Sequence, residues 1–259
     1  MTSIRFASLM LEAQGEGPAV VMLHGLGATS NSWQTLVPAL SGYRIIRPDL
    51  PAAGRSPTPH APMSVASLAD TVLHAVGQLG VQRAHFVGHS FGTLICQHIA
   101  VSRPECVASL ALFGPIREPA EAARERLRER AQLARSEGMC GIADQLLQSG
   151  LSSATHTDNP TALAFVRESH MRQDKEGFAR SCEALAAAKA VDLARIACPA
   201  LVVTGTDDAI APPGVAYEFG DKIDDCRVLI LPRCGHWTPI EKPQECASAL
   251  ADFLRCSTL

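Results

Sequence analysis

The sequence predicts an α/β fold, in which a mostly parallel, twisted sheet is flanked by helices and carries an inserted helical cap. Three observations lead to this prediction. Short apolar runs rich in β-branched residues alternate with segments of helical periodicity, an order typical of a parallel sheet covered on both faces. The alternation is interrupted between Gly114 and Cys198, where only helical patterns occur. The composition, with 47% apolar and 19% charged residues, is that of a globular protein.

Six apolar runs bounded by turn residues are predicted to be buried strands. They are Ala19–Leu23, Tyr43–Ile46, Ala84–Val87, Ala108–Phe113, Pro199–Thr204 and Arg227–Leu231. Closer to the N-terminus, the stretch Ile4–Leu11 alternates in hydrophobicity. We therefore expect that stretch to form one strand at the edge of the sheet.

Helices are predicted between these strands. Ser64–Leu79 carries apolar residues at spacings of three and four, and Ser64 is placed to cap the helix. Phe91–Ser102, Pro213–Phe219 and Lys242–Arg255 are also predicted to be helical. This order of strands and helices indicates one α/β core.

The stretch without strand patterns is predicted to form a cap over the sheet. Its expected helices are Arg117–Glu137, a segment from Asn159-Pro160 through Met171, and Glu176–Ala190. Asparagine followed by proline is typical of a helix start. We expect residues 1–116 and 197–259 to form the core and residues 117–196 to form the cap.

The charge and the cysteines exclude several classes of protein. A net charge of −3 gives no general attraction to nucleic acid or anionic lipid, and no apolar run reaches the length of a membrane span. The N-terminus lacks the pattern of a signal peptide. The nine cysteines are scattered without paired or metal-ligand spacing, which favours free thiols in a reducing compartment. We therefore expect a cytoplasmic protein with a small-molecule substrate and without a metal or cofactor.

A candidate nucleophile lies where a buried strand meets a helix, in the sequence Gly88-His89-Ser90-Phe91-Gly92. A serine on so sharp a turn adopts a strained backbone that exposes its hydroxyl, and the flanking glycines leave room for neighbouring chain. The N–H of Phe91 would stand at the start of the following helix, where a developing negative charge is stabilised. The alternative is an ordinary loop in which the serine only caps the helix.

A serine hydroxyl needs a base, and the base needs a carboxylate that fixes its tautomer. The loop after Pro199–Thr204 contains Asp207 and Asp208, and the loop after Arg227–Leu231 contains His236. Parallel strands end at the same edge of a sheet, so both loops are expected to lie beside Ser90. His24, His89 and His98 are better explained as structural or packing residues.

These motifs resemble those of the α/β-hydrolase superfamily over nearly the whole chain. The matching segments are Leu23-His24-Gly25-Leu26-Gly27, Asp49-Leu50-Pro51-Ala52-Ala53-Gly54-Arg55-Ser56, Gly88-His89-Ser90-Phe91-Gly92, Gly205-Thr206-Asp207-Asp208 and Gly235-His236. The resemblance implies the chain order of nucleophile Ser90, acid Asp208 and base His236. It places the acid at Asp208 rather than at Asp207.

The same resemblance implies an oxyanion hole formed by the backbone N–H groups of Leu26 and Phe91. A donor pair of this kind stabilises the negative charge on the oxygen of a tetrahedral intermediate.

Within the cap, the stretch Glu176–Leu185, with Asp192-Leu193 and Ile196–Pro199 after it, resembles 3-oxoadipate enol-lactonases. Those enzymes hydrolyse an enol lactone that bears a carboxylate. Met171-Arg172 also fits their pattern, so the resemblance implies that Arg172 could pair with a substrate carboxylate; the alternative is an ordinary surface arginine. Further candidates for substrate contact or for an apolar acyl pocket are Met139, Phe165, Met171, Phe178 and Trp237.

The predicted function is that of a serine hydrolase that cleaves a carboxylic ester or an (enol-)lactone through an acyl-serine intermediate. Two other classes of enzyme have a similar set of Ser, His and Asp and remain alternatives. They are carbon–carbon bond hydrolases of meta-cleavage products and cofactor-free oxygenases. A non-catalytic ligand-binding receptor would predict a broken triad, which the sequence does not have. Haloalkane dehalogenases and epoxide hydrolases resemble the chain but use an aspartate nucleophile where this chain has Ser90. Epoxide hydrolases also need tyrosines in the cap to protonate the opening ring, and the only tyrosines here, Tyr43 and Tyr217, lie outside the cap. Both classes are therefore excluded.

Overall fold

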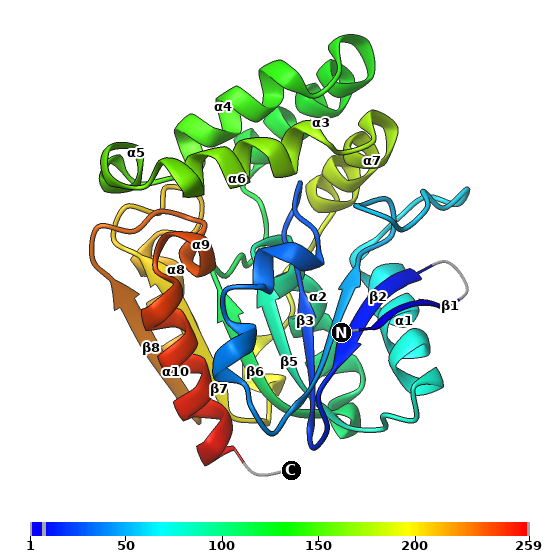
Figure 1. Ribbon diagram of the computed structural model, residues 1–259, viewed down its shortest axis with the longest axis vertical. Helices are drawn as coiled ribbons and strands as arrows, with labels where there is room; N and C mark the ends of the chain where they lie inside the picture. The colour runs from blue at the N-terminus through cyan, green and yellow to red at the C-terminus, as the bar shows by residue number, and fades with distance from the viewer. Residues whose placement is uncertain (1, 7–8, 258–259) are drawn as a thin grey trace.

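A mixed sheet forms the centre of the molecule in the computed structural model, which describes residues 2–6 and 9–257 (Figure 1). Its strands are β1 (Thr2–Phe6), β2 (Leu9–Gln14), β3 (Ala19–Leu23), β4 (Arg44–Asp49), β5 (Ala84–His89), β6 (Val107–Phe113), β7 (Ala200–Gly205) and β8 (Cys226–Leu231). Within the described chain the order of these eight strands is β1-β2-β4-β3-β5-β6-β7-β8. The strands from β4 to β8 run parallel, whereas β2 is antiparallel to both β1 and β4. The α/β prediction is confirmed.

The N-terminal prediction is wrong. The single expected edge strand Ile4–Leu11 is instead two antiparallel strands, and Ile4 pairs with Leu11 across them. Residues 7 and 8, in the middle of the predicted strand, lie outside the described residues. An alternating pattern carries no information about where a chain reverses direction when no turn motif marks the place.

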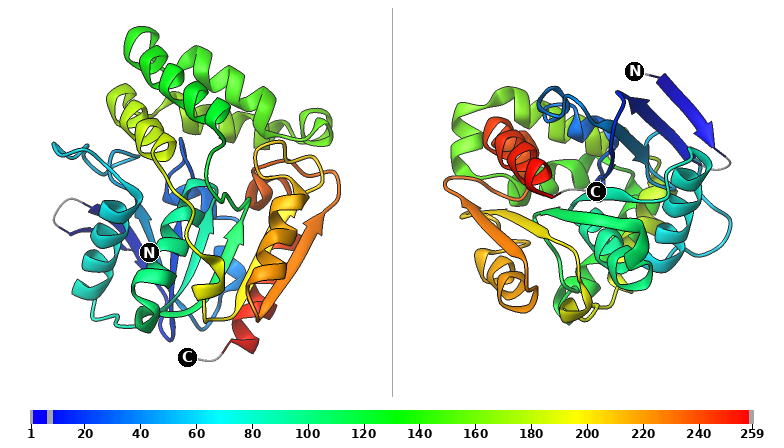
Figure 2. Two further views of the ribbon diagram at one scale, coloured as in Figure 1. Left: turned by 180° about the vertical axis from the view of Figure 1, so that it is seen from behind. Right: turned by 90° about the horizontal axis from the view of Figure 1, so that it is seen from below.

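Helices cover both faces of the sheet, as Figure 2 shows from below. The core helices are α1 (Val65–Gln78), α2 (Phe91–Ser102), α8 (Pro213–Lys222), α9 (Thr238–Glu241) and α10 (Pro243–Cys256), with short 3-10 helices η1 (Ser30–Trp33), η2 (Val37–Ala39), η3 (Pro104–Cys106) and η4 (Leu193–Arg195). Successive strand residues point to opposite faces, so Val202 packs with α1 and α2 in one core cluster while Val203 packs with α10 in another. Apolar side chains are therefore buried on both faces of the central strands, which explains why these strands read as nearly continuous apolar runs.

The cap helices lie above the carboxyl ends of the parallel strands (Figures 1 and 2). They are α3 (Glu121–Glu137), α4 (Cys140–Gly150), α5 (Ser153–Asp158), α6 (Pro160–Met171) and α7 (Lys175–Ala186). Both α3 and α7 are shorter than expected. Pro119 disfavours helical backbone before it, so α3 begins at Glu121 rather than at Arg117. The guanidinium of Arg124 donates to the carbonyl oxygens of Ala186 and Ala188. These bonds supply partners for carbonyl groups at the end of α7, which ends at Ala186 instead of the predicted Ala190.

The helices α4 and α5 were not expected from the sequence. Both are short, and α5 consists mostly of polar residues, so neither carries a long apolar stripe. All nine cysteines lie within the described chain and are free thiols. No helix of the described residues has both the length and the apolar character to cross a membrane.

Candidate active site

The candidate nucleophile occupies a strained turn between β5 and α2. Ser90 has φ 51° and ψ −116°, a region that residues other than glycine seldom adopt. A Cβ atom on Gly92 would lie 2.2 Å from the carbonyl oxygen of Leu23, and one on Gly88 would lie 2.7 Å from the carbonyl oxygen of Gly92. Glycine is therefore required on both sides of the serine because the neighbouring backbone occupies the space of a side chain.

The three residues expected to form a triad are joined by hydrogen bonds. Ser90 Oγ lies 2.8 Å from His236 Nε2, and His236 Nδ1 lies 2.9 Å from Asp208 Oδ2. All three side chains are buried, and they come from the loops that follow β5, β7 and β8. Residues far apart in the sequence thus meet at the carboxyl edge of the sheet.

The carboxylate of Asp208 is held in its charged form. Its Oδ1 accepts hydrogen bonds from the N–H groups of Ile210 at 2.8 Å and Ala211 at 2.7 Å. Burial acts to raise the pKa of Asp208, but His236 and these two donors outweigh it and lower the pKa to about 2. A charged Asp208 accepts from His236 Nδ1–H, so the lone pair of Nε2 faces the Ser90 hydroxyl.

Two further histidines beside the site are neutral and hold its loops. His89 donates from Nε2 to the backbone oxygen of His236 at 2.9 Å, and burial, followed by the nearby His236, lowers the pKa of His89 to about 3. His24 donates from Nδ1 to the Gly25 oxygen at 2.9 Å and accepts from the Leu50 N–H at 2.9 Å. Burial lowers the pKa of His24 as well. Both imidazoles therefore act as neutral structural links, in agreement with the prediction that they are packing residues.

The loop after β3 approaches the serine closely. A Cβ atom on Gly25 would lie 3.0 Å from the Cβ of Ser90. Within the described residues the N–H of Leu26 has no hydrogen-bond acceptor, and the N–H of Phe91, in the first turn of α2, has no intrahelical one. These two free donors are the pair that the sequence predicted for an oxyanion hole.

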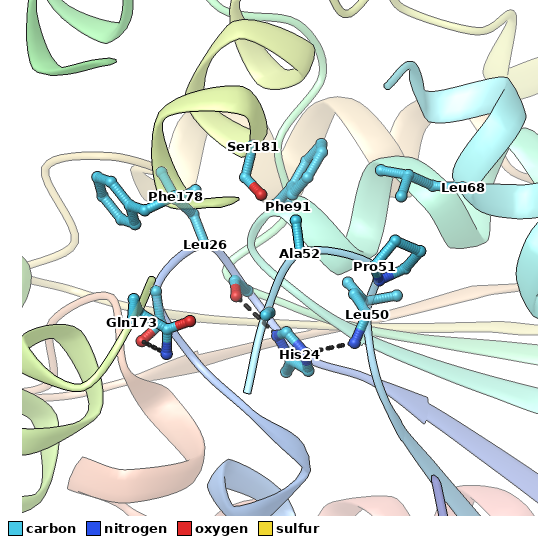
Figure 3. A pocket seen from close by; sticks show the side chains of 13 residues that line it. His24, Leu26, Leu50, Pro51, Ala52, Leu68, Phe91, Gln173, Phe178 and Ser181 are labelled. Atoms are coloured by element: carbon cyan, nitrogen blue, oxygen red, sulfur yellow. Dashed lines mark hydrogen bonds between the residues drawn. The ribbon is translucent and has the colours of Figure 1, made fainter. Parts of the chain in front are cut away.

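A small cavity lies beside these donors, between the core loops and the cap helix α7 (Figure 3). Its volume of about 10 Å³ is close to that of a single water molecule. The lining is mostly apolar and includes Leu26, Phe91 and Phe178, with Gln173 and Ser181 as polar groups from the cap. Phe178, predicted as a substrate contact, thus lies at the cavity.

The other predicted cap contacts are placed differently. Arg172 is exposed, Met171 is half-buried, and neither lines the cavity, which is reached instead by the next residue, Gln173. The placement of Arg172 therefore fits an ordinary surface arginine. Trp237 is buried under the cap, with its ring centroid 5.4 Å from that of His170 and 5.3 Å from that of His89.

Met139 belongs to the large apolar cluster that includes the sheet, and Phe165 packs against a smaller cluster formed by cap and core residues; neither lines the cavity. Their placement is that of core residues. No group of three His, Cys, Asp or Glu residues in the described chain is arranged to hold a metal ion.

Two contacts between the cap and the loops of the candidate site were not predicted from the sequence. Ser169 Oγ donates to the Gly27 oxygen at 2.9 Å, which ties α6 to the loop that carries Leu26. The buried carboxylate of Glu241 accepts hydrogen bonds from both the cap and the loop of His236. The hydrogen-bond partners of Ser169 and Glu241 are mostly backbone groups, so no sequence motif marks these contacts.

Comparison with known proteins places this chain in a family. Residues 18–139 match the family model described as alpha/beta hydrolase fold. The chain is 30% identical to 2-hydroxy-6-oxo-6-(2'-aminophenyl)hexa-2,4-dienoic acid hydrolase of Metapseudomonas resinovorans, over 94% of this chain and 86% of that protein. The enol-lactonase from Burkholderia xenovorans LB400 superimposes with a TM-score of 0.91 at 29% identity, covering 98% of this chain and 100% of that one.

A third similarity is to a thermophilic esterase from Thermogutta terrifontis, with a TM-score of 0.92 and 26% identity over 96% of this chain and 94% of the esterase. A hydrolase is thus the class of protein that the fold and its relatives define. The chain belongs to the α/β-hydrolase family, and within that family it resembles the enol-lactonases.

Proposed function

We propose that the protein is a serine hydrolase that cleaves a carboxylic ester or a lactone through an acyl-serine intermediate. The observation that carries the proposal is the continuous chain of hydrogen bonds from Asp208 through His236 to Ser90, with Ser90 on a strained turn. The two free N–H donors of Leu26 and Phe91 beside the serine also support it. A packing serine would need neither feature.

In the first half of the reaction, His236 Nε2 takes the proton of Ser90 Oγ as this oxygen attacks the carbonyl carbon. The carbonyl oxygen becomes an oxyanion beside the N–H groups of Leu26 and Phe91, each donor contributing about 3 kcal/mol. The carbon–oxygen bond to the leaving group then breaks, and the protonated His236 gives its proton to the departing oxygen. In a lactone this oxygen stays attached to the acyl group.

In the second half, His236 takes a proton from water as the water oxygen attacks the acyl-serine. Breaking of the ester bond returns the proton to Ser90 Oγ and releases the carboxylic acid. Throughout, the charged Asp208 stabilises the imidazolium form of His236. The chemistry needs no group other than these side chains, the two N–H donors and water.

The cavity under the cap supports an apolar acyl group rather than a charged one. Its lining is mainly apolar, and Arg172 stands outside it. A volume of about 10 Å³ is too small for an ester, so the proposal includes a movement of α7 away from the loop of residues 50–53 when a substrate binds.

A carbon–carbon bond hydrolase is the second candidate. The observation in its favour is the 30% identity to a hydrolase of a hexadienoic acid over 94% of this chain. The same Ser90, Asp208 and His236 would serve it, so the two candidates differ in substrate and not in the catalytic groups.

A panel of four substrates tests the proposal: a short p-nitrophenyl ester, a long one, an enol lactone and a meta-cleavage dienone. We expect turnover of an ester or the lactone, and loss of at least about 10³-fold in the variant Ser90→Ala with an unchanged far-UV circular dichroism spectrum. Turnover of the dienone alone would favour the second candidate. Wild-type rates in Ser90→Ala would overturn the role of Ser90.

A further inference from the structure

The loop that carries His236 is held through three consecutive backbone N–H groups. The N–H of Gly235 donates to Glu241 Oε2 at 3.0 Å, and that of Trp237 donates to Glu241 Oε1 at 3.1 Å. Between them, the N–H of His236 donates to the backbone oxygen of Gly150, in the cap, at 2.8 Å. These three N–H groups are therefore held by one buried carboxylate and one cap carbonyl, while His89 holds the backbone oxygen of His236 from the core side.

The same carboxylate also holds the cap. Glu241 Oε2 accepts a hydrogen bond from the Ser152 N–H at 2.9 Å and one from Thr155 Oγ1 at 2.8 Å. Glu241 itself is 7% exposed. Its two oxygens thus accept four hydrogen bonds, two from the start of α5 and two from the loop of His236, and water has little access to any of them.

The two segments approach so closely that a side chain would not fit between them. A Cβ atom on Gly235 would lie 2.7 Å from the Ser152 nitrogen and 2.9 Å from the Gly150 oxygen. Glycine at position 235 therefore allows the loop to contact the cap segment Gly150–Thr155 directly.

We propose that Glu241 is a positioning residue that couples the cap to the base, so that the seating of Gly150–Thr155 sets the position of the His236 imidazole. The inference rests on the proposed function, because it gives His236 the role of base. All four partners of Glu241 are donors, so only a group that accepts at both oxygens can satisfy them. The loop also has a support outside the cap, since Asp207 N–H donates to the Cys234 oxygen at 2.9 Å. Loss of Glu241 should thus displace the loop without unfolding it.

The first test uses the variant Glu241→Gln. The NH₂ group of the glutamine replaces one carboxylate oxygen, and it cannot accept the hydrogen bond or bonds that this oxygen received. A displacement of about 1 Å can lower a rate by about 10²-fold. We expect a 10- to 100-fold loss of kcat, about this scale, with KM for a p-nitrophenyl ester within about threefold of wild type. Labelling of Ser90 by a small fluorophosphonate should slow by the same factor, because it needs the base but little of the substrate pocket.

The second test isolates the cap side of the coupling. Thr155→Val removes one donor to Glu241 from α5 and one acceptor of the Ser152 hydroxyl, while both hydrogen bonds from the loop of His236 to Glu241 stay in place. We expect a smaller but parallel loss in kcat and in the labelling rate, and recovery of both in Thr155→Ser, which keeps the hydroxyl. Glu176→Gln, at an exposed ion pair of the cap with Arg135, is the matched control and should leave both rates unchanged.

Wild-type labelling rates in both Glu241→Gln and Thr155→Val would overturn the coupling. So would a loss in Thr155→Val that Thr155→Ser does not restore. If Glu241→Gln fails to fold, the pair of variants at Thr155 still decides. Failure of the proposed function has a different result, since the wild-type protein would then not be labelled at Ser90 or would be labelled equally in Ser90→Ala.

Discussion

Asp208 Oδ2 lies 2.9 Å from His236 Nδ1, while the carboxylate of the adjacent Asp207 is exposed and accepts a hydrogen bond from Thr206 Oγ1 at 2.8 Å. Two neighbouring acids with the same chemistry therefore stand in different surroundings. The backbone N–H groups of Ile210 and Ala211 donate to Asp208 and hold its carboxylate in place beside His236.

This difference predicts which acid matters for catalysis. Asp208→Asn should lower kcat by about 10³- to 10⁴-fold, because an amide can donate to His236 Nδ1 and favour the wrong tautomer. Asp207→Asn should keep kcat within about threefold of wild type. Steady-state hydrolysis of a p-nitrophenyl ester by both variants checks the prediction, and a larger loss at position 207 would contradict it.

Acid should destabilise the protein through its buried histidines. Burial lowers the pKa of His170 to about 4 and that of His89 to about 3, from an ordinary value of 6.5. Below pH 6.5 these histidines are protonated in the unfolded chain but stay neutral in the folded chain. The free energy of unfolding therefore falls as the pH falls from 6.5 toward 4. Each such histidine contributes a slope of about 1.4 kcal/mol per pH unit.

Urea denaturation at pH 6.5 and at pH 4.5 measures this slope. In His170→Gln the slope should be smaller by about 1.4 kcal/mol per pH unit, whatever the change in stability at pH 6.5. An unchanged slope in this variant would show that His170 does not titrate as its burial requires.

Gly92 should not tolerate a side chain, because its Cβ would lie 2.2 Å from the Leu23 oxygen and 2.8 Å from the His24 oxygen. We expect Gly92→Ala to lower the free energy of unfolding by about 1–3 kcal/mol and to lower kcat, since α2 must move away from β3. Gly77→Ala is the matched control, because a Cβ at this helical position meets nothing within 4 Å. That variant should gain about 0.5–1 kcal/mol. Equal effects of the two substitutions in chemical denaturation would argue against the steric explanation.

A buried ion pair supports the sheet beneath the site. Arg47, which is fully buried, donates to Glu12 at 2.8 Å, and Arg55 lies 3.1 Å from the same carboxylate. Glu12→Gln should cost about 3 kcal/mol of stability, because it removes the negative charge that pairs directly with the buried guanidinium of Arg47. Lys222→Gln, at the exposed pair with Glu218, should have no measurable effect in the same denaturation experiment. A small loss at Glu12 would mean that other partners compensate the charge.

The sequence was most informative where burial is complete. β3 was predicted with its observed bounds, and β5 and β7 within two residues, because strands buried on both faces are short apolar runs between turns. The edge hairpin of β1 and β2 and the short helices α4 and α5 were not predicted correctly. Their residues face solvent on one side, so neither apolar periodicity nor length distinguishes them from loops.

The candidate site shows a similar limit. Ser90, Asp208 and His236 belong to motifs whose glycines and flanking strands are visible in the sequence. Gln173 and Glu241 belong to none, because their partners are mostly backbone groups brought close by the tertiary fold. The exposure of Arg172, in contrast to Gln173, depends on the rotation of the end of α6, which a one-residue pattern cannot fix.

The insertion between β6 and β7 joins the rest of the chain by only two covalent connections. Even so, Gly150 accepts from the N–H of the proposed base His236, Ser152 donates to Glu241, and Ser169 donates to the loop that carries Leu26. Exchange of this insertion between relatives would thus transplant part of the reaction machinery along with the binding surface. A chimaera with the insertion of a relative would take on that relative's turnover together with its selectivity, unless the anchoring groups of the original insertion are kept.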